Sequence, residues 1–151
     1  MPTSIIVAVI SLFVMMAGRL TMTLLREDSG ISSILHIIIP FSISILILVG
    51  IINGHKLAWQ WGRIIGLLGS MAMSALSAVF FAMKEPMEGK IFLGTMMLIQ
   101  AVAFYAMFRA LGTAEAKKHF GLICPQCGTD TAKAGDFLFT QAVCRNCNAR
   151  W

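Results

Sequence analysis

The sequence predicts an all-α membrane protein, a four-helix transmembrane bundle with a small C-terminal β tail. Three observations predict this fold class. Of the 151 residues, 58% are hydrophobic and only 13% are charged, whereas soluble domains carry about 25% charged residues. The apolar residues form long stretches that end near Leu111. Beyond them the composition becomes polar, and the chain closes with four cysteines in two CxxC pairs.

Four segments are long and apolar enough to cross a bilayer, which takes about 20 helical residues. They are residues 4–25, 31–52, 61–83 and 90–111, within a transmembrane region that we place at 1–112. In lipid, each backbone donor must be satisfied within its own segment, so isolated spans of this length are helices. Pro40 in the second span is expected to kink the helix without ending it. The short connections predict an up-down bundle of antiparallel neighbours.

The basic residues predict the orientation. An even number of spans places both termini on one side, and eight of the 12 Lys and Arg residues then lie on that side: Lys56, Arg63, Arg109, Lys117, Lys118, Lys133, Arg145 and Arg150. The other four are Arg19, Arg26, Lys84 and Lys90. The positive-inside rule therefore places both termini in the cytoplasm, and we expect a bacterial inner membrane. Because the net charge of +5 comes mostly from residues that flank the spans, we expect a lipid bilayer and no nucleic acid as partner.

The cysteines follow a metal-site spacing. Cys124 and Cys127 are separated by two residues, as are Cys144 and Cys147, with 16 residues between the pairs. This spacing is read as a zinc site, because two tight turns can aim four thiolates at one tetrahedral ion. Residues 124–151 are too few to fold without such support. We therefore expect a zinc ribbon here, preceded by a basic linker at 113–123.

Other chemistries of the same cysteines are open. The first knuckle, CPQCG, resembles the iron-binding knuckle of rubredoxins, whereas CRNCN lacks the proline and glycine of such a knuckle. Paired disulfides would need an oxidising compartment, and a thioredoxin-like redox pair would need a βαβ context. His119 is a fifth ligand candidate, which we assign to the linker because four cysteines already complete the shell. Zn²⁺ is the expected cofactor and Fe the alternative.

The arrangement of the whole chain resembles a known class of proteins. Multiple apolar spans, a short basic linker and a terminal FGLICPQCG…CRNCN ribbon are similar to small bacterial four-span membrane proteins with a C-terminal zinc ribbon. The resemblance is specific in the ribbon and only architectural in the spans. It implies an accessory integral membrane protein and transfers no catalytic residues.

The third span carries small residues at every fourth position. They are Gly62, Gly66, Ser70, Ser74, Ala78 and Ala82. Small residues at this spacing let membrane helices approach closely. Because such a row winds around a helix with 3.6 residues per turn, its early and late members are expected to face different partners. The row predicts packing within the bundle or an interface with another subunit.

Arg19, His36 and Gln100 are candidates for a polar site inside the spans. Arg19 and His36 are each expected near the outer surface and could meet across the first hairpin, whereas Gln100 lies near mid-depth of the last span. Ionisable groups in a membrane indicate function by default. The plainer interpretation is snorkelling or structural pairing for Arg19. For Gln100 it is a hydrogen bond to the serines of the third span.

Enzyme signatures are missing. The sequence contains no HExxH motif, glycine-rich phosphate loop or acidic pair in a span. We therefore expect a non-catalytic accessory protein that displays a cytoplasmic structural zinc ribbon, with other membrane subunits or its own copies as partners. The alternatives are a membrane-tethered electron carrier with iron, and a small oligomeric transporter or channel working through Arg19, His36 and Gln100.

Overall fold

The computed structural model describes the backbone of residues 2–24, 31–83, 87–130, 132–134 and 141–151. It also describes their side chains, except those of residues 23–24, 31–37, 87–88, 90 and 132–134. The helices are α1 (Thr3–Leu24), α2 (Ile31–Ile52), α3 (Lys56–Ala82), α4 (Met87–Leu111) and α5 (Ala114–His119). The strands are β1 (Ala132–Ala134) and β2 (Ala142–Cys144). The protein is therefore mostly helical, with its cysteines and short strands at the C-terminal end.

Three helices among the described residues are long and apolar enough to cross a membrane: Thr3–Met22, Lys56–Ala82 and Ile91–Leu111. The expected fourth span coincides with α2, whose described apolar part, Ile38–Ile52, is shorter than a span. The helix itself continues through Pro40, whose carbonyl oxygen accepts a 2.8 Å hydrogen bond from the Ser44 hydroxyl. The described residues thus establish three candidate spans rather than four.

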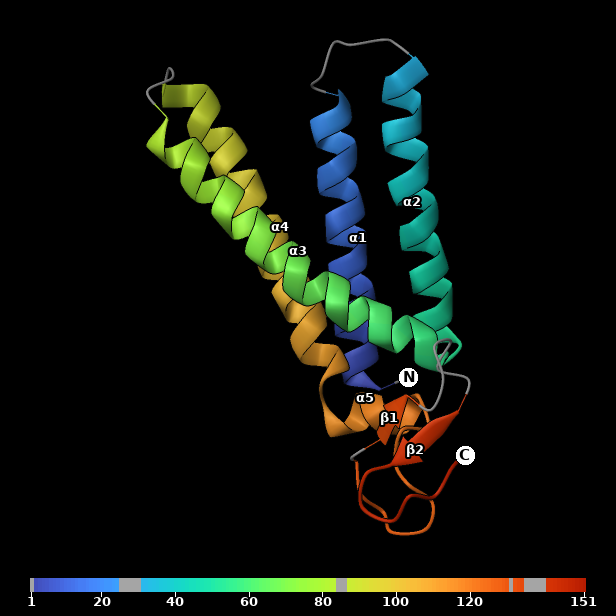
Figure 1. Ribbon diagram of the computed structural model, residues 1–151. Coiled ribbons are helices and arrows are strands. Elements are labelled where there is room, and N and C mark those ends of the chain that lie inside the picture. The colour runs from blue at the N-terminus through green and yellow to red at the C-terminus, as the bar shows by residue number, and fades with distance from the viewer. Residues whose placement is uncertain (1, 25–30, 84–86, 131, 135–140) are drawn as a thin grey trace.

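The long helices form two hairpins that meet at one end of the molecule (Figure 1). Helix α4 packs along α3 and also against α1, whereas α2 makes fewer contacts with its neighbours. The two hairpins diverge toward the end opposite the strands. The N-terminus of α1, the α2–α3 turn, α5 and both strands all gather at the other end, which we call the ribbon end.

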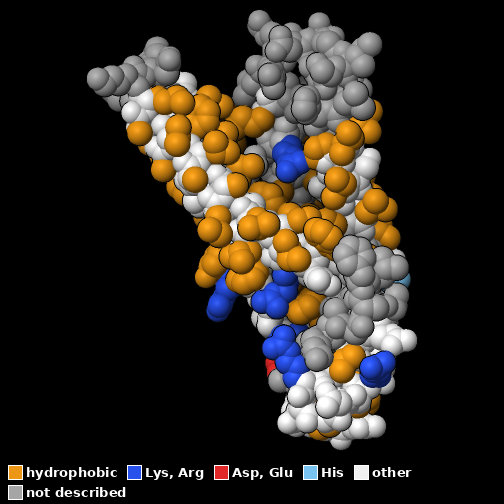
Figure 2. All heavy atoms as spheres, in the orientation of Figure 1, with side chains coloured by type: hydrophobic (Ala, Val, Ile, Leu, Met, Phe, Trp, Pro, Cys, Tyr) orange, Lys and Arg blue, Asp and Glu red, His pale blue; other side chains and the backbone are white. Residues whose placement is uncertain are grey.

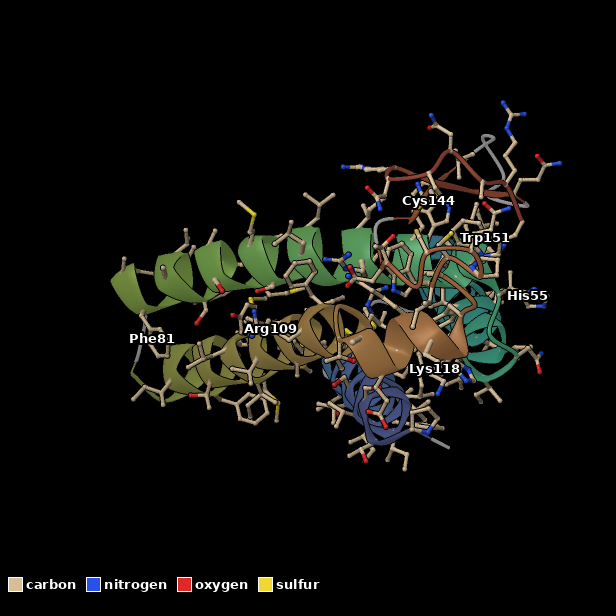
Figure 3. The ribbon with its side chains drawn as sticks, turned by 90° about the horizontal axis from the view of Figure 1, so that it is seen from below. His55, Phe81, Arg109, Lys118, Cys144 and Trp151 are labelled. Atoms are coloured by element: carbon tan, nitrogen blue, oxygen red, sulfur yellow. The ribbon has the colours of Figure 1, made fainter. Side chains whose placement is uncertain are left out.

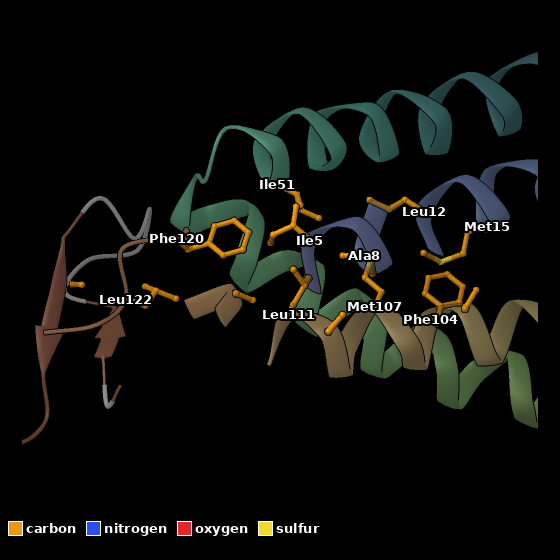
Figure 4. Packing of buried hydrophobic residues seen from close by; sticks show 14 residues of the cluster. Ile5, Ala8, Leu12, Met15, Ile51, Phe104, Met107, Leu111, Phe120 and Leu122 are labelled. Carbon is orange, nitrogen blue, oxygen red and sulfur yellow. The ribbon is translucent and has the colours of Figure 1, made fainter. Parts of the chain in front are cut away.

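A core of apolar side chains joins α1 to α4 (Figure 4). The buried residues of α1 recur every three or four positions, as one face of a helix requires. The cluster includes Ile5, Ala8, Leu12 and Met15 from α1, Ile51 from α2, and Phe104, Met107 and Leu111 from α4. Its members Ile5, Ile51, Met107 and Leu111 are fully buried, so the three helices share one tightly packed centre near the ribbon end.

Residues 113–123, expected to be a basic linker, contain the packed helix α5. Thr113 caps the helix, because its hydroxyl oxygen accepts a hydrogen bond from the Ala116 amide. Ala116, Phe120 and Leu122 are buried in the same core as the long helices. The carboxylate of Glu115 accepts hydrogen bonds from the backbone amides of Thr3 and Ser4, both at 3.3 Å. The segment therefore fastens the C-terminal ribbon to the start of α1.

Strands β1 and β2 form an antiparallel pair with Lys133 opposite Val143. On its other side β2 pairs with the last residues, since Ala142 and Trp151 exchange backbone hydrogen bonds of 2.8 and 3.0 Å. Residues 135–140, which lie between the two strands in the sequence, are outside the described residues.

On the face shown in Figure 2, hydrophobic side chains cover much of the described helices, and few of them lie on the C-terminal ribbon. Large side chains such as Leu46, Leu68 and Val102 are 71%, 60% and 62% exposed. Soluble monomers rarely expose contiguous apolar surface on this scale. This distribution is consistent with the three helices that are long and apolar enough to cross a membrane.

Candidate metal centre

The four cysteines converge on one point. Their sulfur atoms all lie within 4.8 Å of one another. Cys124 Sγ lies 3.6 Å from Cys147 Sγ, and Cys127 Sγ lies 3.5 Å from Cys144 Sγ. Four sulfurs that bind a central zinc ion at about 2.3 Å are about 3.8 Å apart in a tetrahedron. The cluster therefore fits a four-thiolate metal site, and all four residues are free thiols rather than disulfides.

The first knuckle is a tight turn. The carbonyl oxygen of Cys124 accepts a 2.9 Å hydrogen bond from the Gly128 amide, and the Cys124 amide donates to the Thr129 carbonyl oxygen at 2.9 Å. Gly128 has a positive φ of 68°. Glycine adopts this left-handed conformation without steric cost, which lets the chain reverse just after the second sulfur.

The second knuckle repeats this geometry with a different residue. The Cys144 carbonyl oxygen accepts a 3.1 Å hydrogen bond from Asn148, and the Cys144 amide donates to Ala149 at 2.9 Å. Asn148, with a φ of 59°, occupies the place that Gly128 has in the first knuckle. Asparagine is one of the few other residues that visits this conformation routinely. The sequence CRNCN therefore builds the same turn, although it lacks the glycine.

Thr129 joins the two knuckles, a role that the sequence analysis missed. Its hydroxyl lies 3.1 Å from Cys127 Sγ and 3.5 Å from Cys144 Sγ. The Thr129 hydroxyl, followed by backbone N–H groups of the second knuckle, lowers the pKa of Cys144 to about 5. Thr129 also lowers the pKa of Cys127 below its usual value. These hydrogen bonds favour the thiolate form, which is the form that binds metal.

Cys147 behaves in the opposite way. The Ala149 amide lowers its pKa, but desolvation and the neighbouring thiols of Cys124, Cys144 and Cys127 together raise the pKa to about 12. Four thiolates this close repel one another, so without a cation at least one keeps its proton. The four cysteines would lose that proton on holding a divalent metal, which would supply the missing positive charge.

The cluster is held against the helices by its flanking residues. The Trp151 indole donates a 2.7 Å hydrogen bond to the Gly121 carbonyl oxygen, and the Lys56 ammonium donates to the Trp151 carbonyl oxygen at 3.2 Å. His119 Nε2 lies 3.1 Å from the Ile51 carbonyl oxygen at the end of α2, and His119 does not belong to the cysteine cluster. Seen from the ribbon end, Cys144 and Trp151 lie over the start of α3, and Phe81 marks its far end (Figure 3). The cluster is thus fixed relative to the bundle.

The small-residue row of α3 divides between two environments. Gly62 and Gly66 are buried, and a Cβ on Gly66 would meet the backbone oxygen of Phe104 at 3.0 Å on α4. Ser70 is half-buried, whereas Ser74, Ala78 and Ala82 are exposed. The early members therefore pack against α4, and the late members form part of the outer surface of the chain.

Of Arg19, His36 and Gln100, the structure describes the side chains of Arg19 and Gln100. Gln100 is buried at 4% exposure and packs against Gly18 of α1. Among the described serines of α3, Ser77 donates a 2.9 Å hydrogen bond to the Gly94 carbonyl oxygen on α4. Arg19 is half-buried on α1. The side chain of His36 lies outside the described residues, and so does its expected contact with Arg19.

Comparison of the chain with protein-family models, with curated proteins and with solved structures finds no match. The resemblance to four-span zinc-ribbon proteins therefore identifies no family. The features that stand are three long apolar helices and a C-terminal cluster of four cysteines able to hold a metal ion.

Proposed function

We propose that this protein is a non-catalytic accessory subunit of the bacterial inner membrane that holds a structural zinc ribbon at the cytoplasmic face. One observation carries the proposal: Phe120, Leu122 and Ala142 are buried in the core that joins the membrane helices. A tail on a flexible tether would sample many positions. A ribbon packed in this way presents one fixed surface to a partner in the same membrane.

Zinc suits the cluster because four thiolates complete its tetrahedral shell. Structural zinc sites are closed in this way, whereas catalytic sites keep one position for water or substrate. When bound, zinc would supply folding free energy to a module too small to fold alone. The residues that would hold it are Cys124, Cys127, Cys144 and Cys147.

A membrane-tethered electron carrier with iron is the second candidate. The observation in its favour is that Asn148 takes the left-handed place of Gly128, so the second knuckle makes the turn of the rubredoxin-like first knuckle although it lacks the glycine. The absorption spectrum of the purified protein separates the two, because ferric thiolate is coloured and zinc thiolate is colourless. A visible ferric-thiolate absorption band, together with stoichiometric iron, would contradict the accessory role and support electron transfer instead.

The orientation of the protein in the membrane depends on whether α2 is a fourth span. If α2 crosses the bilayer together with the three candidate spans, both termini lie on one side, as their meeting at the ribbon end supports. The positive-inside rule then places the ribbon end, with its excess of Lys and Arg, in the cytoplasm. There the thiols stay reduced and available to metal.

Site-specific photocrosslinking from the ribbon tests the accessory role. A photoreactive residue at Gln126 or at Asn146, both exposed on the knuckles, is expected to capture the same membrane protein in intact cells. Leu68, exposed on α3, is the matched control and should capture lipid instead. A ribbon that captures no recurrent protein from either position would contradict the proposal.

A further inference from the structure

An open groove runs between α2 and α3 next to the turn that joins them. It has a volume of about 920 Å³. Its walls are apolar and include Ile43, Leu46 and Ile47 from α2 and Leu57, Trp61 and Ile65 from α3. The helices touch below it, since a Cβ on Gly50 would lie 2.5 Å from the Ala58 side chain. The groove is therefore closed where the two helices touch and open at the outer surface of the bundle.

The end of the groove at the α2–α3 turn is basic. His55 and Lys56 line it there, and no carboxylate occurs among its lining residues. The Lys56 ammonium donates one hydrogen bond to the Trp151 carbonyl oxygen, and an ammonium has three donors. The ammonium also lies 6.0 Å from the centre of the Trp151 ring, and two of its three donors remain for an anion. Helix α3 begins at Lys56 with no side-chain cap on its first turn, which adds to the positive potential.

The surface around the basic end of the groove is also positively charged. The described basic residues at the ribbon end are Lys56, Arg63, Arg109, Lys117, Lys118, Arg145 and Arg150, and the described acidic residues are Glu115 and Asp130. Asp130 is paired with Lys117 at 2.7 Å, and Glu115 accepts from the α1 amides. An anionic ligand is thus attracted to this end from several directions.

We propose that the groove binds an anionic phospholipid, with an acyl chain between α2 and α3 and the phosphodiester headgroup at Lys56 and His55. The proposal depends on the membrane embedding of the proposed function, but not on the metal. The walls lie on helices whose outer faces are apolar, and the basic end lies at the turn where α2 ends and α3 begins. A lipid of the adjacent leaflet has this same order of apolar chain and anionic head. Basic pockets between membrane helices are known as headgroup sites.

A second copy of the chain suits the groove less well. Copies in one membrane share an orientation, so a second ribbon end would bring its own Lys and Arg residues to the level of Lys56. Like charges at that level repel, whereas a phosphodiester is attracted. Charge therefore favours the lipid.

Native mass spectrometry of the intact protein tests the headgroup. The probes are phosphatidylglycerol and phosphatidylcholine with identical acyl chains. Because one basic residue near a lipid surface contributes about 1 kcal/mol, Lys56→Gln is expected to lower the preference for phosphatidylglycerol about fivefold. Lys118→Gln, which removes an exposed charge of α5 outside the groove, should retain the preference. Equal binding of both lipids to the wild type, or equal losses in the two variants, would overturn the proposal.

A second pair of variants tests the groove without touching the ribbon. Leu46→Trp fills the groove from α2, and Leu68→Trp adds the same bulk on α3 away from it. We expect Leu46→Trp to weaken both lipids and Leu68→Trp to bind like the wild type. Unchanged lipid binding by Leu46→Trp overturns the site, and a wild-type dimer that Leu46→Trp dissociates shows that a second copy occupies it. The metal content of each sample shows separately whether the ribbon is folded. A chain that stays soluble without detergent would contradict the proposed membrane embedding rather than the lipid site.

Discussion

Asn148 shows how one residue can replace glycine at a metal knuckle. Its positive φ is costly for most side chains, by about 1–2 kcal/mol. Asn148→Ala is therefore expected to destabilise the metal-loaded ribbon by about 1 kcal/mol, measured by unfolding in detergent. Asn148→Gly is the matched control, because glycine adopts the same conformation freely. If alanine were tolerated as well as glycine, the second knuckle would not have the turn of the first.

The pKa values of the cysteine thiols predict how metal affinity depends on pH. Metal binds thiolates, so protons compete with it and affinity falls as pH falls. Because the pKa of Cys147 is about 12, binding at neutral pH must displace its proton. Because the pKa of Cys144 is about 5, a further proton competes below that pH. Chelator competition should therefore show affinity decreasing from pH 8 to pH 5 and more steeply below about pH 5. A pH-independent affinity would contradict the thiolate site.

At the residue scale, cysteine spacing was sufficient to predict which four side chains meet. It could not predict the hydrogen bonds of Thr129 to two sulfurs, because Cys127 and Cys144 come together only in the folded ribbon. The role of Asn148 did have a local signal, since asparagine after a tight turn favours the left-handed conformation. The absence of glycine from CRNCN obscured that signal.

The contact between α3 and α4 depends on close approach at Gly66. A Cβ there would meet backbone atoms of Phe104 and Phe108 at 3.0 and 3.1 Å, and backbone cannot rotate away. Gly66→Ala is expected to destabilise the bundle by about 1–3 kcal/mol, as overpacking does. Gly89→Ala on α4 is the control, because nothing lies within 4 Å of its Cβ position. Unfolding in detergent measures both, and equal stability of the two variants would show that the helices are not packed as described.

Helix α5 depends on its contacts with other elements. Glu115 lies at the N-terminus of α1, where a negative charge contributes about 0.3–1 kcal/mol. Glu115→Gln keeps the shape and removes the charge, so we expect a loss in that range in thermal unfolding. Asp130→Asn, which removes an exposed ion pair with Lys117, should have no measurable effect. A larger loss for Asp130→Asn than for Glu115→Gln would contradict the assigned role of α5.

At the element scale, hydropathy indicated where the long helices lie but not where they begin. Helix α3 starts at Lys56, before the apolar span at 61–83, because the amphipathic first turns with Trp59 and Arg63 pack at the ribbon end. Trp59 donates a 2.7 Å hydrogen bond to the Leu111 carbonyl oxygen there. Helix α5 has six residues, too few for a periodic pattern, and helices this short depend on tertiary packing.

At the scale of the whole molecule, the ribbon and the bundle share one core. Removing the metal should therefore loosen the contacts of Trp151 and Lys56 as well as the knuckles. We expect chelation to increase hydrogen exchange in residues 142–151 and at the start of α3. Exchange in residues 70–82, far from the ribbon, should stay unchanged. Exchange confined to the knuckles would show that the ribbon is attached without being coupled to the helices.

The sequence predicted a soluble tail beside a bundle, but not that the tail is packed into it. Phe120 and Leu122 fall in the predicted linker at 113–123, because other members of their core, such as Ile5 and Ile51, are distant in sequence. Long-range contacts of this kind depend on how the hairpins meet.

Metal analysis of the protein purified from membranes tests whether the four cysteines hold zinc. We expect one zinc ion per chain in a colourless protein, and loss of that zinc in Cys144→Ser. Wild-type protein without bound metal, or Cys144→Ser with its metal fully retained, would contradict it.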